Sequence, residues 1–84
     1  MAQLIRSNGE LIEVTPKNGT DFKWEELKDM IGGYIEIVRL RNGNMLVVDE
    51  EGKVKKRPVN IVASQLAGQA IVGDVVFCAI DQVL

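Results

Sequence analysis

Two Asn-Gly dipeptides constrain the fold of this chain more than any other feature of its sequence. Asn8-Gly9 and Asn42-Gly43 each lie between two short apolar runs that have the length of a β-strand. Asn-Gly in this setting is the strongest local signal for a β-hairpin, because both residues tolerate the positive φ of a type I′ turn. The sequence therefore predicts one hairpin at the N-terminus and another in the middle of the chain.

A two-residue turn in each hairpin decides which residues lie opposite each other. It places Ile5 opposite Ile12, and it places Glu36 opposite Asp49, where two like charges repel and a nearby cation is expected. It also gives the second hairpin two apolar faces, which is typical of strands covered on both sides. The predicted faces carry Val38, Leu40, Met45 and Val47 on one side and Ile35, Ile37, Leu46 and Val48 on the other.

Two short helices are expected from the spacing of apolar residues and from glycines at the helix ends. Trp24, Leu27 and Ile31 recur at helical spacing, and Gly32-Gly33 ends that helix. The aromatic residues expected in the core are Phe22, Trp24 and Phe77. Because lysine is a poor N-cap, the start of the helix stays open among Lys23, Asp21 and Thr20. Asn60 predicts the N-cap of a second helix, Ile61 to Ala67, which Gly68 ends.

These elements predict an α+β fold. An apolar run at residues 75–80 adds a last strand, so the order is β-β-α-β-β-α-β. Residues 1–84 are expected to form a single small domain, because a chain of this length rarely supports two cores. Two topologies stay open: a β-grasp sheet, as in ubiquitin-like domains, and a related mixed sheet with the same order.

The composition argues against catalysis, metal binding and a membrane span. The chain has no histidine, which excludes a Cys-His nucleophile pair and removes the commonest metal ligand. Its one cysteine, Cys78, lies in an apolar run, and a single cysteine fits a reducing cytoplasm. A net charge of −2 argues against duplex DNA as a partner. We expect no enzyme, no catalytic residue, no metal, no cofactor and no membrane association.

The one cluster of cations in the sequence is the candidate ligand site. It lies at residues 53–57 and is a phosphate-contacting loop, a rim that meets an acidic partner, or a solvated loop that balances the acids before it. Tyr34 is a candidate for stacking on a base, and Asn60 for presenting helix amides to a phosphate. With two arginines of the second hairpin, the candidate ligand-binding residues are Tyr34, Arg39, Arg41, Lys53, Lys55, Lys56, Arg57 and Asn60.

Four short motifs lie at residues 32–38 (GGYIEIV), 48–53 (VDEEGK), 58–60 (PVN) and 71–75 (IVGDV), with Ala63 and residues 66–68 between them. Through these motifs most of the chain resembles a family of small proteins carried by bacteriophages and by plasmids and mobile elements of gut bacteria, a domain of unknown function. The resemblance implies a phage or mobile-element origin and a place in the cytoplasm of the host cell. It supplies no catalytic or binding residues.

Small acidic phage proteins without catalytic groups resemble inhibitors of host defence. The leading expectation is a non-enzymatic protein that sequesters a nucleotide immune signal, such as a cyclic nucleotide or an ADP-ribose-type ligand. The alternatives are an inhibitor that binds a host defence protein directly, such as a CRISPR or other nuclease effector, and an accessory protein of replication or DNA maintenance. A homo-oligomer is also expected, because two helices on one side of the sheet would leave its other apolar face uncovered.

Overall fold

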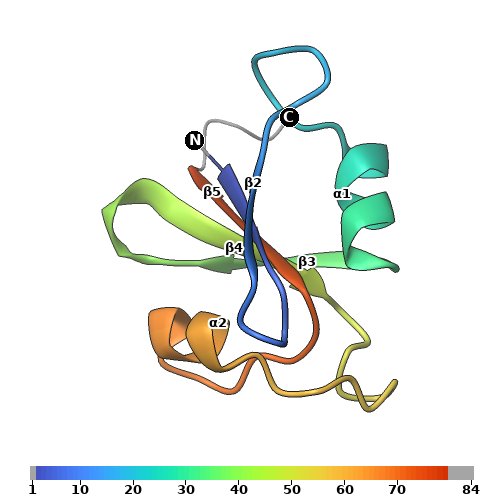
Figure 1. The fold of residues 1–84 in the computed structure, drawn as a ribbon, viewed down its shortest axis with the longest axis vertical. Helices are drawn as coiled ribbons and strands as arrows, with labels where there is room; N and C mark the ends of the chain where they lie inside the picture. Colours follow the sequence, from blue (N-terminus) through green and yellow to red (C-terminus); the bar gives the residue numbers. More distant parts are fainter. Residues whose placement is uncertain (1, 80–84) are drawn as a thin grey trace.

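Five strands form one sheet in the order β2-β1-β5-β4-β3, and every neighbouring pair is antiparallel. The computed structural model describes residues 2–79 of the chain. The last strand lies in the centre of the sheet, and β2 and β3 form its two edges (Figure 1). The elements are β1 (Ala2–Ile5), β2 (Leu11–Val14), α1 (Trp24–Ile31), β3 (Ile35–Arg39), a 3-10 turn (Arg41–Gly43), β4 (Asn44–Asp49), α2 (Ile61–Ala67) and β5 (Val75–Ala79).

The predicted α+β class and the order β-β-α-β-β-α-β are confirmed. Of the two topologies left open, the structure has the related sheet of the same order, and that sheet is antiparallel rather than mixed. The β-grasp arrangement pairs its first and last strands in parallel, whereas β1 and β5 are antiparallel here, with Gln3 opposite Phe77. Residue 80, which was expected to end the last strand, lies outside the described residues.

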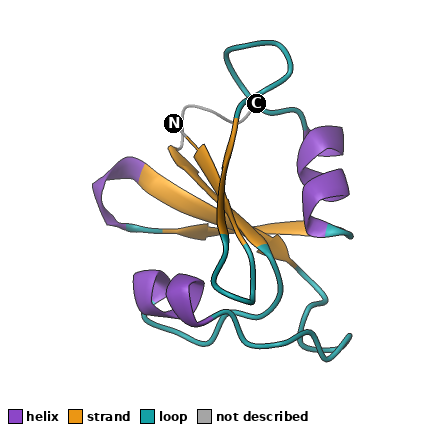
Figure 2. Ribbon diagram, in the orientation of Figure 1, coloured by secondary structure: helices purple, strands orange, loops and turns teal. Residues whose placement is uncertain are grey.

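The two helices lie on opposite faces of the sheet (Figure 2). On one face α1 packs into a core that includes Phe22, Leu27 and Val47. On the other face Ala63 of α2 packs with a second core that includes Leu46. The premise that one face stays uncovered is therefore wrong, and the expected homo-oligomer loses that support. Within residues 2–79, neither helix combines the length and the apolar character needed to cross a membrane.

Both Asn-Gly hairpins have three-residue loops instead of the predicted two. Arg6 N–H donates to Glu10 O over 2.8 Å, and Leu40 N–H donates to Asn44 O over 2.9 Å. The glycine is the third loop residue, with φ of 94° at Gly9 and 74° at Gly43. This is the geometry of a turn closed by a glycine bulge, in which only the glycine needs positive φ.

The extra loop residue shifts the register of each hairpin by one, which exchanges the two faces of one strand relative to its partner. Ile5 lies opposite Leu11 rather than Ile12, and Asp49 lies opposite Ile35 rather than Glu36. The predicted division of the second hairpin into two faces is therefore wrong. Ile35, Ile37, Met45 and Val47 share the α1 face, and Val38, Leu40, Leu46 and Val48 share the α2 face.

Helix α1 begins at Trp24 with Lys23 as its N-cap, so the earlier starts are excluded. The carboxylate of Glu26 supplies the missing cap, because it accepts hydrogen bonds from Lys23 N–H and Lys17 N–H, each over 2.9 Å. Trp24 is 48% exposed, so its predicted place in the core is wrong. Phe22, which is fully buried just before the helix, fills the core at this end instead.

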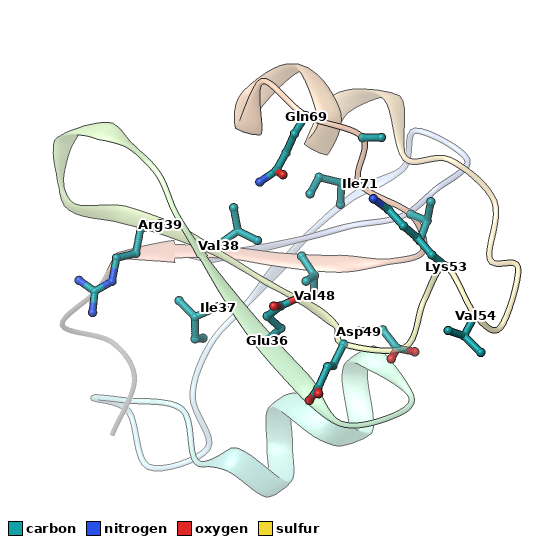
Figure 3. Close-up of a pocket in the computed structure, with 13 residues that line it drawn as sticks. Glu36, Ile37, Val38, Arg39, Val48, Asp49, Lys53, Val54, Gln69 and Ile71 are labelled. Carbon is teal, nitrogen blue, oxygen red and sulfur yellow. The ribbon is translucent and has the colours of Figure 1, made fainter.

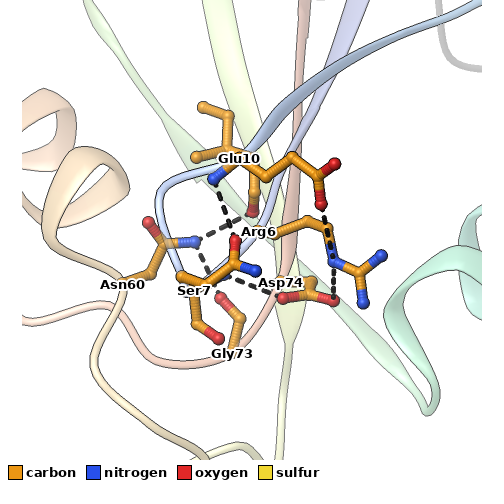
Figure 4. A network of polar contacts seen from close by, with 8 residues as sticks. Arg6, Ser7, Glu10, Asn60, Gly73 and Asp74 are labelled. Carbon is orange, nitrogen blue, oxygen red and sulfur yellow. Dashed lines mark hydrogen bonds and ion pairs between the residues drawn. The ribbon is translucent and has the colours of Figure 1, made fainter.

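The predicted N-cap at Asn60 is confirmed, and its buried side chain also joins α2 to the sheet (Figure 4). Asn60 Oδ1 accepts from Ala63 N–H over 3.0 Å. Asn60 Nδ2 donates to Ile5 O and to Gly73 O, each over 2.9 Å. Because these carbonyls belong to the end of β1 and to the turn before β5, one amide connects α2 to the two strands beneath it.

Replacing Asn60 by Ala should lower the free energy of unfolding by about 3 kcal/mol. The change removes a helix cap worth ~1 kcal/mol and leaves two buried carbonyls unpaired at ~1 kcal/mol each. Urea denaturation followed by circular dichroism measures the change. Gln65→Ala, at an exposed position of the same helix, is the control and should change the free energy by less than ~0.5 kcal/mol. A loss below ~1 kcal/mol for Asn60→Ala would contradict the anchoring role.

Candidate functional site

One buried carboxylate fixes the path of the basic loop, residues 50–57. The side chain of Asp49 is fully buried, and its Oδ2 accepts from Lys55 Nζ over 3.0 Å and from Arg57 Nε over 2.7 Å. Arg57 also donates from its guanidinium to Gly32 O over 3.2 Å, beside the end of α1. The cation expected near Asp49 is therefore present, although Asp49 does not face Glu36.

Two glycines leave the space that these cations occupy. A Cβ at Gly33 would lie 2.5 Å from Lys55 Nζ, and a Cβ at Gly73 would lie 2.7 Å from Arg57 Cδ. A larger residue at Gly73 would collide with the stem of Arg57, and one at Gly33 would require the flexible end of Lys55 to move. Lys55 and Arg57 are thus parts of the folded loop, and their charges are already engaged.

The pKa of the Asp49 carboxyl lies below its ordinary value. Burial raises this pKa, but the hydrogen bonds from Glu51 N–H, Lys55 and Arg57 favour the ionised form and outweigh burial. Because the pKa is lower in the folded state than in the unfolded state, the ionised carboxylate contributes stability above the unfolded pKa. That contribution is lost as the pH falls through the lower, folded pKa.

Replacing Asp49 by Asn should lower the free energy of unfolding by about 2 kcal/mol at pH 7, because it leaves two partly exposed cations without their partner. The difference between wild type and variant should shrink as the pH falls below about 4, where the carboxyl of the unfolded chain becomes protonated, and should be smallest once the folded carboxyl, with its lower pKa, is protonated as well. Thermal melts from pH 7 to pH 2.5 measure this. Glu50→Gln makes the same change of charge at the exposed neighbouring position. Equal losses in both variants at pH 7 would contradict the role of Asp49.

The structure does not bring the eight candidate ligand residues together. Lys55 and Arg57 bind Asp49, and all three hydrogen bonds of the Asn60 side chain stay within the protein. Tyr34 is 64% exposed, and Lys28 Nζ lies 4.7 Å from the centre of its ring. Lys56 is exposed on the basic loop. The remaining three candidates, Arg39, Arg41 and Lys53, line two grooves on the α2 side of the sheet.

The first groove, which we call the β3 groove, lies between β3 and the segment that follows α2 (Figure 3). Its volume is about 490 Å³, and Val38, Val48 and Ile71 give it an apolar surface. Charged residues of both signs line it together with the apolar ones, namely Glu36, Asp49, Glu50, Arg39 and Lys53. The candidate ligand residues chosen from the sequence include both cations of this lining but none of its three carboxylates or its apolar residues.

The second groove, which we call the α2 groove, lies between the C-terminal half of α2 and the loop of the β3–β4 hairpin. Its volume is about 680 Å³. Its polar lining residues are Arg39, Arg41, Asn44 and Gln65, and its other lining residues are Leu40, Leu66, Ala67, Gly68 and Phe77. No carboxylate is among these described residues, which distinguishes this groove from the β3 groove.

The outer side of β3 is a free strand edge. Tyr34 O accepts from Glu50 N–H, and Leu40 N–H donates to Asn44 O, so these pairs are hydrogen-bonded. Bonded and non-bonded pairs alternate in an antiparallel ladder. The backbone groups of Ile35, Ile37 and Arg39 therefore point away from β4. Within residues 2–79 no strand pairs with this side of β3, and residues 36–39 line the β3 groove beside it.

Cys78 has the environment of a structural cysteine. It is fully buried, and burial raises the pKa of its thiol to about 11. A thiol with this pKa is almost entirely protonated at neutral pH and is a poor nucleophile. In the described part of the chain, no three Cys, Asp or Glu side chains gather in a way that could hold a metal ion.

A comparison with protein families finds a match over nearly the whole chain. The model of the family DUF3846, a domain of unknown function, matches residues 2–83. Searches of curated proteins and of solved structures find no significant match. The expected membership in a family of unknown function is confirmed, whereas the phage or mobile-element origin stays a prediction.

Proposed function

Because this chain belongs to the DUF3846 family, whose description assigns no activity, we propose its function from its own surface. The protein is a non-enzymatic binding protein that holds an extended segment of a partner protein along the free edge of β3. The observation that carries this proposal is the outward-facing backbone of Ile35, Ile37 and Arg39, which lies directly beside the β3 groove.

A strand of the partner added to the sheet would use both the free edge of β3 and the β3 groove. Its backbone would bond the free N–H and C=O groups of β3, which is the usual way in which a sheet edge binds a peptide. Alternate side chains of that strand point to the same face of the sheet. Those on the α2 face would enter the β3 groove, whereas the others would lie toward the α1 face.

The residues that line the β3 groove indicate which side chains the partner segment should have. Val38, Val48 and Ile71 favour apolar side chains at alternate positions. Glu36 and Glu50 suit a cationic side chain, and Lys53 suits an anionic one. We therefore propose a segment that has apolar residues on one face and charges of both signs near its ends.

The setting that we propose is counter-defence. A protein that blocks a defence nuclease or another effector by occupying part of its surface needs no catalytic group, and this chain contains no histidine and one buried cysteine. The resemblance to phage and mobile-element proteins supports a place in the cytoplasm of a host cell. An accessory role in replication or DNA maintenance would use the same edge with a different partner.

Capture of a nucleotide signal by the eight residues chosen from the sequence has less support. Lys55 and Arg57 are engaged by Asp49, and Asn60 is buried. In the β3 groove the carboxylates of Glu36 and Glu50 would repel a phosphate. Binding of a protein segment is the function that the β3 groove supports best.

The substitution that tests the proposal is Ile37→Pro, compared with Ile37→Ala. Both remove the side chain, but only proline removes the outward N–H, and edge strands tolerate proline where the N–H faces solvent. A partner captured from host lysate is identified by mass spectrometry, purified and titrated by calorimetry against both variants. Ile37→Pro should bind it at least tenfold more weakly than Ile37→Ala, because strand hydrogen bonds and close approach are lost.

Circular dichroism must show that both variants are folded. Equal affinities of the two variants for the partner would contradict binding at the strand edge. If wild type sediments as a dimer that Ile37→Pro dissociates, the occupant of the edge is a second copy of this chain, and the proposal of a different partner fails.

A further inference from the structure

We infer that the α2 groove binds a nucleotide, by its phosphate and its base together, at a site separate from the free edge of β3. This groove belongs to the opposite end of α2 from Asn60 and is bounded by the loop of the β3–β4 hairpin. Of the residues on β3 itself, Arg39 lines both grooves, and no other described residue does.

Within residues 2–79, two of the four arginines form ion pairs with carboxylates and two do not. Arg6 lies 3.8 Å from Glu10 and 3.7 Å from Asp74, and Arg57 is bonded to Asp49. Arg41 lines the α2 groove and takes part in no ion pair within residues 2–79. Arg39 borders the same groove, but its side chain extends to the side of the sheet opposite that of Val38 (Figure 3). A guanidinium presents donors in a fork that matches the oxygens of a phosphate. The guanidinium of Arg41 provides the cationic part of a phosphate site.

The other polar residues of the groove do not oppose an anion. Within residues 2–79 the lining of the groove holds no carboxylate. Asn44 and Gln65 add side-chain amides, each of which both donates and accepts hydrogen bonds. The protein carries a net charge of −2, so attraction of an anion has to come from a local cluster such as this one.

The apolar wall selects a ligand with a flat apolar part. Leu66 is 47% exposed, and Phe77 is partly buried beside it in the lining. An inorganic anion would leave these side chains unused, whereas a base would cover them and place its polar edge near the amides. The volume of about 680 Å³ lies within the range of sites for molecules of nucleotide size.

Calorimetry with cyclic diadenylate, ADP-ribose and inorganic phosphate tests the inference on wild type, Arg41→Ala and Lys56→Ala. Lys56 is the matched control, because its loss changes the net charge equally and it lies outside both grooves. At least one of the two nucleotides should bind tenfold or more tightly than phosphate. Arg41→Ala should weaken that binding by roughly tenfold or more, whereas Lys56→Ala should stay within about twofold of wild type.

Three results would overturn the inference: no binding of either nucleotide at about 1 mM, equal weakening in Arg41→Ala and Lys56→Ala, or phosphate binding as tightly as the nucleotides. Ile37→Pro separates this site from the strand edge. It should bind the nucleotide as wild type does, because its substituted residue does not line the α2 groove. A nucleotide affinity lost in Ile37→Pro would show that the two sites are one, and the inference of a separate site would fail.

Discussion

The buried amide of Asn60 is the contact on which the functional side of this molecule depends. Helix α2 has seven residues, which is too short for a helix to be stable without tertiary contacts. The amide caps this helix and binds carbonyls on both sides of it in sequence, at Ile5 and Gly73. The β3 groove and the α2 groove both use residues of α2 or of the segment after it. One side chain therefore holds the position of both candidate sites.

The cations of this protein fall into two groups, those bound to a buried carboxylate and those that are not. The cluster that stands out in the sequence largely serves the fold, because Lys55 and Arg57 neutralise the buried Asp49. A carboxylate removed from water needs such partners, and the glycines at residues 33 and 73 leave room for them. The isolated arginines of the β3–β4 hairpin have no such role among the described residues. Their charges stay available to a ligand, although nothing in the sequence distinguishes them from other surface arginines.

The sequence predicted what local chemistry decides and missed what distant contacts decide. Asn60 caps the start of α2 and Gly68 ends it, as predicted, because capping depends on a few neighbouring residues. The hairpin registers were wrong, because Asn-Gly fits a two-residue turn and also a three-residue loop that ends in glycine. The pairing of Asp49 with Arg57 depends on the path of the basic loop between them, which no short sequence pattern specifies. The free edge of β3 follows from β5 entering between β1 and β4, which no local pattern specifies.

The proposed function requires that β3 presents unpaired backbone groups along its outer edge. Amide hydrogen exchange of the free protein, measured residue by residue by NMR, reports whether these groups are free. Exchange should be fast at Ile35, Ile37 and Arg39, whereas Glu36, Val38 and Leu40 should be protected, because their N–H groups face β4. Protection at all six positions would mean that the edge is already paired or covered, and would contradict the proposed function.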